Sequence, residues 1–199
     1  MGTTSNHLAT SPDGITWTAR TVGFTVYEKN ALAFGNSVFA VRVGAVIYTS
    51  ADGATWVNRG TPSITPSIGP FFAKDRFVIG NGSGQLMSST DGITWSAMTN
   101  PSGGSYYLRT ATGGNGSAVV GLSNNYAYHT RDFSGWDSQS LPNRMDWIAY
   151  GAYRFAALNS GTGANTAYAT VPYNYETTSQ FKTPTVIVPA GNVKAYIKS

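Results

Sequence analysis

Few side chains in this sequence are of the types that perform acid–base or nucleophilic chemistry. The 199 residues include 9 Asp and Glu, 2 His and no Cys, which excludes thiolate nucleophiles, thiolate metal sites and disulfides. The two histidines, His7 and His129, lack a third metal-ligating partner, and we interpret them as strand residues. Glycosidases generally need two positioned carboxylates, and outside a repeated motif the chain has only Glu28, Asp75, Asp137, Asp146 and Glu176. The sequence therefore predicts no catalytic residues, no metal and no cofactor.

The other four carboxylates belong to a motif that repeats along the chain. Its copies are Ser11–Trp17, Ser50–Trp56, Ser89–Trp95 and Thr130–Trp136, so the aspartates step by 39, 39 and 41 residues. An Asp followed by Gly favours a tight turn, in which the carboxylate accepts backbone hydrogen bonds and Gly takes a positive φ. One carboxylate per turn is too few for calcium, so we expect the motif to be structural, with its tryptophans largely buried between strands. The residues concerned are Asp13, Trp17, Asp52, Trp56, Asp91, Trp95, Asp132 and Trp136.

A second turn recurs between the copies of this motif, flanked by aromatic or small apolar residues. It occurs at Phe34–Phe39, Phe72–Phe77, Ala111–Ala118 and Tyr150–Phe155. Around it lie short runs rich in Val, Ile, Tyr, Phe and Thr, bounded by Gly, Asn and Asp, which is typical of β-strands. No window has the periodicity of an amphipathic helix. The sequence predicts an all-β protein with two hairpins in each repeat.

Charge and hydropathy exclude two classes of partner. The 13 Lys and Arg give a net charge of +4, but they are spread along the whole chain, which argues against a nucleic-acid partner. No apolar run is long enough to cross a bilayer and no signal-peptide pattern opens the chain. We therefore expect a soluble protein without membrane insertion.

The Ser-x-Asp-Gly-x-Thr-Trp segments resemble the Asp-box, or bacterial neuraminidase repeat (BNR), found in the propellers of sialidases and of many non-enzymatic proteins. In that family the box is the turn between the third and outermost strands of a blade. The resemblance implies a small β-propeller, in which each repeat forms a sheet of four antiparallel strands and the sheets surround a central axis.

Counting the repeats favours five blades in one domain, residues 1–199. The repeats lie near 31–69, 70–107, 108–146 and 147–182. The first box has no inner hairpin before it, so we predict that residues 1–30 and 183–199 together complete the first blade. Residues 183–199 have the form of this missing inner hairpin, with two alternating apolar runs around a turn. The alternative is a four-bladed ring with a C-terminal arm that pairs with another subunit.

The resemblance does not extend to an active site. Sialidases use three arginines that hold the substrate carboxylate, a Tyr nucleophile paired with Glu, and an Arg-Ile-Pro segment that is absent here. We therefore expect a protein that is not an enzyme.

A second resemblance concerns the C-terminus. The segment that ends with Val193–Lys198 is similar to the last strands of tailed-phage tail and fibre proteins. It implies an extracellular virion protein of the tail, fibre or decoration type. Its expected partners are other virion proteins or copies of itself, together with a host-surface glycan or receptor. A free-standing lectin-like, carbohydrate-binding propeller is the first alternative, and a sialidase-like glycosidase is the second.

Candidate ligand-binding residues lie in the loops predicted on the face opposite the boxes. Aromatic rings stack on the apolar face of a sugar, while Asn and Arg supply hydrogen bonds to its hydroxyls. The structural alternative is that the tyrosines cover the core or meet a neighbouring subunit. The candidates are Phe24, Tyr27, Arg42, Tyr106, Tyr107, Asn124, Asn125, Tyr126 and Arg144.

Overall fold

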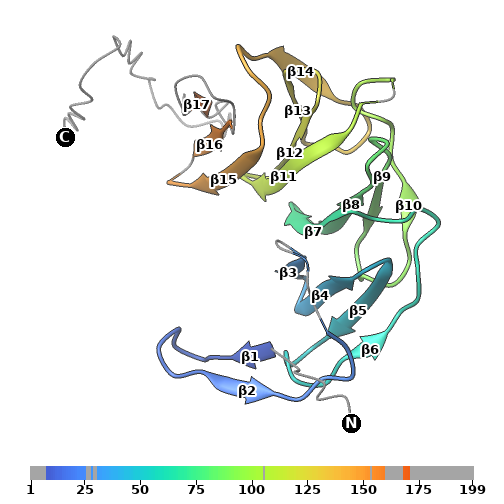
Figure 1. Ribbon diagram of the computed structural model, residues 1–199, viewed down its shortest axis with the longest axis vertical. Coiled ribbons are helices and arrows are strands. Elements are labelled where there is room, and N and C mark those ends of the chain that lie inside the picture. The colour runs from blue at the N-terminus through green and yellow to red at the C-terminus, as the bar shows by residue number, and fades with distance from the viewer. Residues whose placement is uncertain are drawn as a thin grey trace, which may run out of the picture.

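The computed structural model describes residues 8–25, 28, 31–104, 106–152, 154–159 and 168–170. This part of the chain contains 17 strands in five antiparallel sheets and no helix. It therefore has no helix that could cross a membrane. The sheets follow one another along an arc, with the first strand of each complete sheet on the inside (Figure 1). The prediction of an all-β protein is confirmed.

Three sheets each contain four strands, paired in chain order. The first sheet consists of β3 (Leu32–Gly35), β4 (Val38–Val43), β5 (Val46–Ser50) and β6 (Val57–Asn58). The second consists of β7 (Ile68–Ala73), β8 (Arg76–Gly80), β9 (Leu86–Ser89) and β10 (Ser96–Ala97). The third consists of β11 (Leu108–Gly114), β12 (Ser117–Leu122), β13 (Tyr126–Thr130) and β14 (Asp137–Ser140). Each sheet is thus two successive hairpins.

Two smaller sheets lie at the ends of the arc (Figure 1). One pairs β1 (Leu8–Thr10) with β2 (Thr18–Arg20). The other contains β15 (Trp147–Gly151), β16 (Arg154–Leu158) and β17 (Tyr168–Thr170). Residues 183–199, which we predicted to complete the first sheet, lie outside the described residues. The blade count and the closure of the ring therefore stay predictions.

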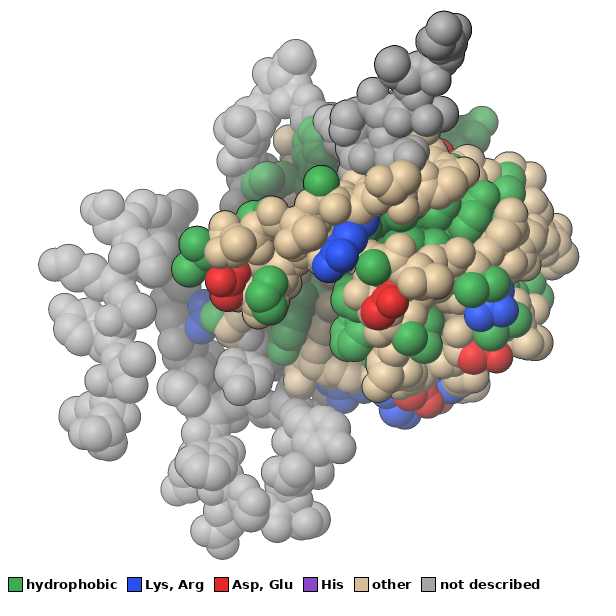
Figure 2. Space-filling view, turned by 90° about the horizontal axis from the view of Figure 1, so that it is seen from below, with side chains coloured by type: hydrophobic (Ala, Val, Ile, Leu, Met, Phe, Trp, Pro, Cys, Tyr) green, Lys and Arg blue, Asp and Glu red, His purple; other side chains and the backbone are tan. Residues whose placement is uncertain are grey.

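The core lies between the sheets. All six residues of β12 are buried, as are the last four of β8, because these second strands are covered on both faces. One cluster joins Val78 and Leu86 with Leu108 and Val120 of the following sheet. Charged side chains are few and scattered on the face shown in Figure 2. Burial of apolar side chains between neighbouring sheets therefore holds the sheets together along the arc.

The four copies of the repeated motif form turns, here called the aspartate turns, that join the last two strands of a sheet. Asp13 Oδ1 accepts hydrogen bonds from the N–H groups of Thr16 and Ile15, both at 2.8 Å, and from the Ser11 hydroxyl at 2.9 Å. These bonds, with that from Thr16 contributing most, lower the pKa of Asp13 to about 2. Asp52 and Asp91 accept the equivalent bonds. The carboxylates are therefore occupied in holding their own turns.

The fourth aspartate turn departs from this pattern. Phe133 has a φ of 63° at the position that Gly occupies in the other three turns. The Ser134 hydroxyl donates to Asp132 Oδ2 at 2.7 Å, and its N–H donates to Oδ1 at 3.0 Å. These bonds, the hydroxyl first, lower the pKa of Asp132 to about 2. An extra hydroxyl donor thus holds a turn that lacks the glycine.

Adjacent sheets are tied together at the end of the strands where the aspartate turns lie, here called the turn face. Asn36, in the β3–β4 hairpin, donates from Nδ2 to the carbonyl oxygens of Asp75 at 2.7 Å and Thr90 at 2.9 Å. Asp75 belongs to the first hairpin of the next sheet and Thr90 to its aspartate turn. Both kinds of turn therefore share the turn face. The opposite ends of the strands form the loop face, which carries the connections between sheets.

Close packing of the inner strands depends on glycine. A Cβ atom added at Gly35 would overlap the ring of Phe72 in the next sheet, and one at Gly114 would overlap the ring of Tyr150. One at Gly113 would overlap the carbonyl oxygen of Phe72. The sheets can therefore approach this closely only because these positions have no side chain.

The tryptophans of the aspartate turns are less buried than predicted. Trp56, Trp95 and Trp136 are half-buried, and each packs against one core cluster. Trp17 is 63% exposed. The prediction that all four are largely buried is wrong, because an indole at the outer edge of a sheet is covered on one side only.

Candidate ligand-binding site

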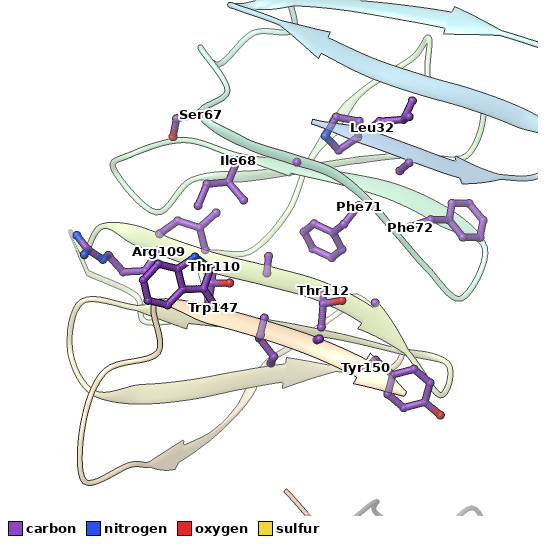
Figure 3. A pocket seen from close by; sticks show the side chains of 18 of the residues that line it. Leu32, Ser67, Ile68, Phe71, Phe72, Arg109, Thr110, Thr112, Trp147 and Tyr150 are labelled. Atoms are coloured by element: carbon purple, nitrogen blue, oxygen red, sulfur yellow. The ribbon is translucent and has the colours of Figure 1, made fainter. Parts of the chain in front are cut away.

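The inner strands of four sheets line a cavity of about 850 Å³. Its walls come from β3, β7, β11 and β15 (Figure 3). Small-molecule sites usually have volumes of about 300–1,000 Å³. Ser67, Ile68, Arg109 and Trp147 lie toward one end of the cavity, which opens on the loop face, and Tyr150 lies toward the other, on the turn face (Figure 3). The two mouths differ in chemistry.

The turn-face mouth is lined by aromatic rings, each of which packs against a second ring of its own sheet. Phe34, Phe72 and Tyr150 each contact an aromatic ring of the second strand of their own sheet. The ring centroids are 4.5 Å apart for Phe34–Phe39, 5.0 Å for Phe72–Phe77 and 4.8 Å for Tyr150–Phe155. These pairs offer few hydrogen-bonding groups to a polar ligand.

The loop-face mouth is charged. Arg109 donates from Nε at 3.2 Å and from Nη2 at 2.9 Å to Oδ1 of Asp146. Arg144 donates from Nε to both carboxylate oxygens of Asp146, at 3.2 and 3.3 Å. The Asp146 side chain is only 6% exposed, whereas those of Arg109 and Arg144 are 39% and 44% exposed. One buried carboxylate thus orients two accessible guanidinium groups and leaves the group with a net positive charge.

An exposed indole adjoins this charged group. Trp147 is 53% exposed, and it lines a second, smaller cavity of about 290 Å³ together with Leu108, Arg109 and Asp146. Among the side chains that line the two cavities in the described part of the chain, Asp146 is the only carboxylate. In the same part, no group of three or more His, Asp or Glu could hold a metal ion.

A β-bulge sets the direction of Arg109. Leu108 pairs with Leu122 and Thr110 pairs with Gly121, so Arg109 is an extra residue on β11. A bulge breaks the strict alternation of side chains along a strand. The charged side chain of Arg109 therefore lies at an irregular position of β11, whose residues after it are Thr, Ala and Gly.

Two predicted ligand residues, Tyr106 and Tyr107, lie on the loop face just before this bulge. They are 42% and 66% exposed. The N–H of Tyr107 donates to Ser123 Oγ at 3.1 Å, and the N–H of Ser123 donates to the Tyr107 carbonyl oxygen at 2.9 Å. The loop that carries the tyrosines is therefore fixed against the β12–β13 loop.

The β12–β13 loop contains three further candidates. Asn124 donates from Nδ2 to the Tyr128 hydroxyl at 2.7 Å, and Asn125 has a φ of 60° in the turn itself. Tyr126 is 39% exposed. The two asparagines therefore shape the loop, while the Tyr126 ring is open to solvent.

The structure removes Phe24 and Arg42 from the candidate site. Phe24 is 9% exposed and packs against the rings of Tyr48 and Trp56. Arg42 is 5% exposed and donates to the carbonyl oxygens of Gly69, Gly44 and Ser67 at 3.0–3.1 Å; burial lowers its pKa. Both side chains join neighbouring sheets, so the prediction that they meet a ligand is wrong. Tyr27 lies outside the described residues.

Sequence reasoning found Arg144 but missed three residues that lie beside it. These residues belong to two different repeats: Arg109 and Asp146 to 108–146, and Trp147 to 147–182. Only the packing of β11 against β15 brings them together. The sequence did contain a signal for two of them. Arg109 lies at the start of a predicted inner strand and Asp146 immediately before the next one, in a chain with only 11% charged residues.

Comparison with solved structures identifies the fold. The structure of YCF48 bound to D1 peptide has a TM-score of 0.57 and 13% identity, over 72% of this chain and 52% of that one. BBS1N in complex with ARL6DN has a TM-score of 0.57 and 16% identity, over 76% of this chain and 54% of that one. The computationally designed Ika4 protein has a TM-score of 0.53 and 10% identity, over 77% and 99%.

The chain has the fold of a β-propeller. It spans about half the length of the YCF48 and BBS1N chains and nearly all of Ika4. No protein-family model matches the sequence, and no curated protein matches it. At these identities the likeness establishes the fold alone.

Proposed function

We propose that this protein is a non-enzymatic recognition domain that binds a glycan on its loop face. The observation that carries the proposal is the pair Tyr106 and Tyr107. Both rings are exposed, at 42% and 66%, although the backbone of Tyr107 is held by hydrogen bonds to Ser123 in the neighbouring loop. Exposed aromatic rings on a fixed backbone give a ligand a surface that needs little ordering on binding.

The composition of the loop face favours a sugar. A tyrosine ring covers the apolar face of a pyranose, and its hydroxyl group bonds to sugar hydroxyls. Tyr126 adds a further exposed ring on the loop face, and Arg109 and Trp147 line a cavity there. Paired-carboxylate hydrolysis needs a second carboxylate near the first, whereas Asp146 already forms ion pairs with two arginines. Binding is therefore the better-supported function.

The proposed setting is the surface of a phage virion, in a tail, fibre or decoration protein. Its support is the resemblance of the C-terminal residues to tail and fibre proteins. In this setting the domain would associate with other virion proteins or with its own copies, and its loop face would recognise the host surface.

The proposal includes a ring of five sheets that residues 183–199 complete. Two features of the ends of the arc support it. Phe34 is 55% exposed, although the equivalent ring Phe72 lies against Gly35 of the preceding sheet. Gly151, equivalent to Gly35 and Gly114, has no described atom within 4 Å of a Cβ position. A further inner hairpin between these two ends would cover both.

A glycan array tests the proposal. Wild-type protein should bind a subset of glycans, and the double variant Tyr106→Ala/Tyr107→Ala should lose that binding while keeping its melting temperature. Trp17→Ala, which removes an exposed ring on the turn face, is the matched control and should bind as wild type does. Binding that survives in the double variant, an array without signal, or cleavage of chromogenic glycoside substrates would each contradict the proposal.

A further inference from the structure

The loop-face mouth of the cavity has hydrogen-bond donors that its own ion pairs leave unused. Arg109 contacts Asp146 through Nε and Nη2, and Arg144 contacts it through Nε. The remaining donors are Nη1 of Arg109 and both Nη groups of Arg144, which have no hydrogen-bond partner among the described residues. A guanidinium group presents its donors in a planar fork that matches a carboxylate.

The charge balance of the group favours an anion. Two arginines share the single carboxylate of Asp146, so one positive charge stays uncompensated. The Asp146 side chain is 6% exposed, and its hydrogen bonds to both guanidinium groups orient them. An anion that binds there meets donors that are already in place, which lowers the entropy cost of binding.

We infer that this mouth is a subsite for an acidic sugar, whose carboxylate binds Arg109 and Arg144 while its ring lies on the Trp147 indole. The inference rests on the proposed function and names its ligand class. The indole is 53% exposed and shares a cavity of about 290 Å³ with Arg109. That volume is near the lower limit, about 300 Å³, of small-ligand sites, which suits a single sugar ring.

The indole is the reason for choosing a sugar over an acidic peptide. Both ligands carry carboxylates, and the arginines would bind either. A broad aromatic face beside the charges matches the flat apolar face of a pyranose ring. Tyr106 and Tyr107 present two further exposed rings on the same loop face, on which the next sugar units would lie. Asp146 acts as a positioning residue, because its carboxylate is buried and already bonded.

The experiment compares trigalacturonate with its methyl ester, which has the same sugar rings without the charges, by isothermal titration calorimetry. Wild-type protein should bind the acid at least tenfold more tightly than the ester. Arg109→Gln should weaken binding of the acid about tenfold or more, the range for a hydrogen bond to a charged group, and leave the ester unchanged. Arg76→Gln is the matched control: it also removes one positive charge, but from an arginine that pairs with Asp75 on the turn face.

Three outcomes would overturn the inference. Equal binding of acid and ester, unaffected by Arg109→Gln, would leave the glycan-binding function standing without its acidic subsite. Binding of hexaglutamate but not of trigalacturonate, sensitive to Arg109→Gln, would show that the ligand is a peptide. Absence of binding to both saccharides, together with a silent glycan array, would contradict the proposed function as well. Loss of binding of the acid in Trp147→Ala, with an unchanged melting temperature, would support the stacking role of the indole.

Discussion

Replacing Gly113 by Ala should destabilise the protein strongly, because the inner strands β7 and β11 approach each other at this residue. A Cβ atom there would overlap the carbonyl oxygen of Phe72. That oxygen belongs to the backbone of β7, which is hydrogen-bonded to β8, so it cannot rotate away as a side chain could. The two sheets would have to separate.

The size of the effect follows from the cost of overpacking. Extra atoms in a packed core lower the free energy of unfolding by about 1–3 kcal/mol and occasionally more. A clash with a backbone atom should cost an amount near the upper end of this range, because the backbone cannot move aside. We expect a loss of about 3 kcal/mol. For a chain of 199 residues, 1 kcal/mol shifts Tm by about 2–4 °C, so Tm should fall by about 6–12 °C.

Thermal unfolding followed by circular dichroism measures this change. Gly23→Ala is the control, because no described atom beyond its chain neighbours lies within 4 Å of a Cβ at Gly23 and its φ is not in the left-handed region. The control should keep the wild-type Tm or raise it slightly. A Tm of Gly113→Ala within 2 °C of wild type would refute the close packing of β7 against β11 that builds the cavity wall.

Three further predictions concern the turns and the ends of the arc. Hydrogen bonds lower the pKa of the turn aspartates, to about 2 for Asp13. Because this folded-state pKa lies below the unfolded value of about 3.9, the ionised aspartates stabilise the folded protein fully above about pH 4. This stabilisation is lost as the pH falls through 2. Tm measured from pH 5 to pH 2 should show this loss, and a flat profile would contradict it. Trp56→Ala should cost about 2 kcal/mol in urea unfolding, roughly half the loss for a fully buried Trp, and Trp17→Ala should cost less than half as much; equal losses would contradict the difference in burial. Deletion of 183–199 should give an insoluble or strongly destabilised protein, whereas a soluble, folded monomer would favour the four-bladed alternative.

The elements predicted well are those whose signals are local. An Asp-Gly turn or a hairpin flanked by aromatic residues folds by bonds within a few residues, so its position can be read from one segment. The starts of β11 at Leu108 and β15 at Trp147 agree with the expected repeat boundaries. These local signals predict where the strands begin and end, but they do not predict which side chains are buried by a neighbouring sheet.

The errors in the candidate site concern contacts between sheets. Phe24 lies in a stretch that reads as a loop, yet it fills a space between Tyr48 and Trp56. Arg42 resembles an exposed loop residue, yet its guanidinium bonds to carbonyl oxygens of the next sheet. The bulge at Arg109 breaks the alternation on which inward and outward positions are predicted. The charged mouth of the cavity could therefore not be assembled from the sequence alone.

Photo-crosslinking of a bound glycan tests the loop-face account most directly. The probe is a diazirine derivative of the glycan with the strongest array signal, and crosslinked residues are located by mass spectrometry. The account predicts crosslinks in 106–109 and 144–147, with competition by the unmodified glycan. Crosslinks confined to the aspartate turns on the opposite face would contradict it.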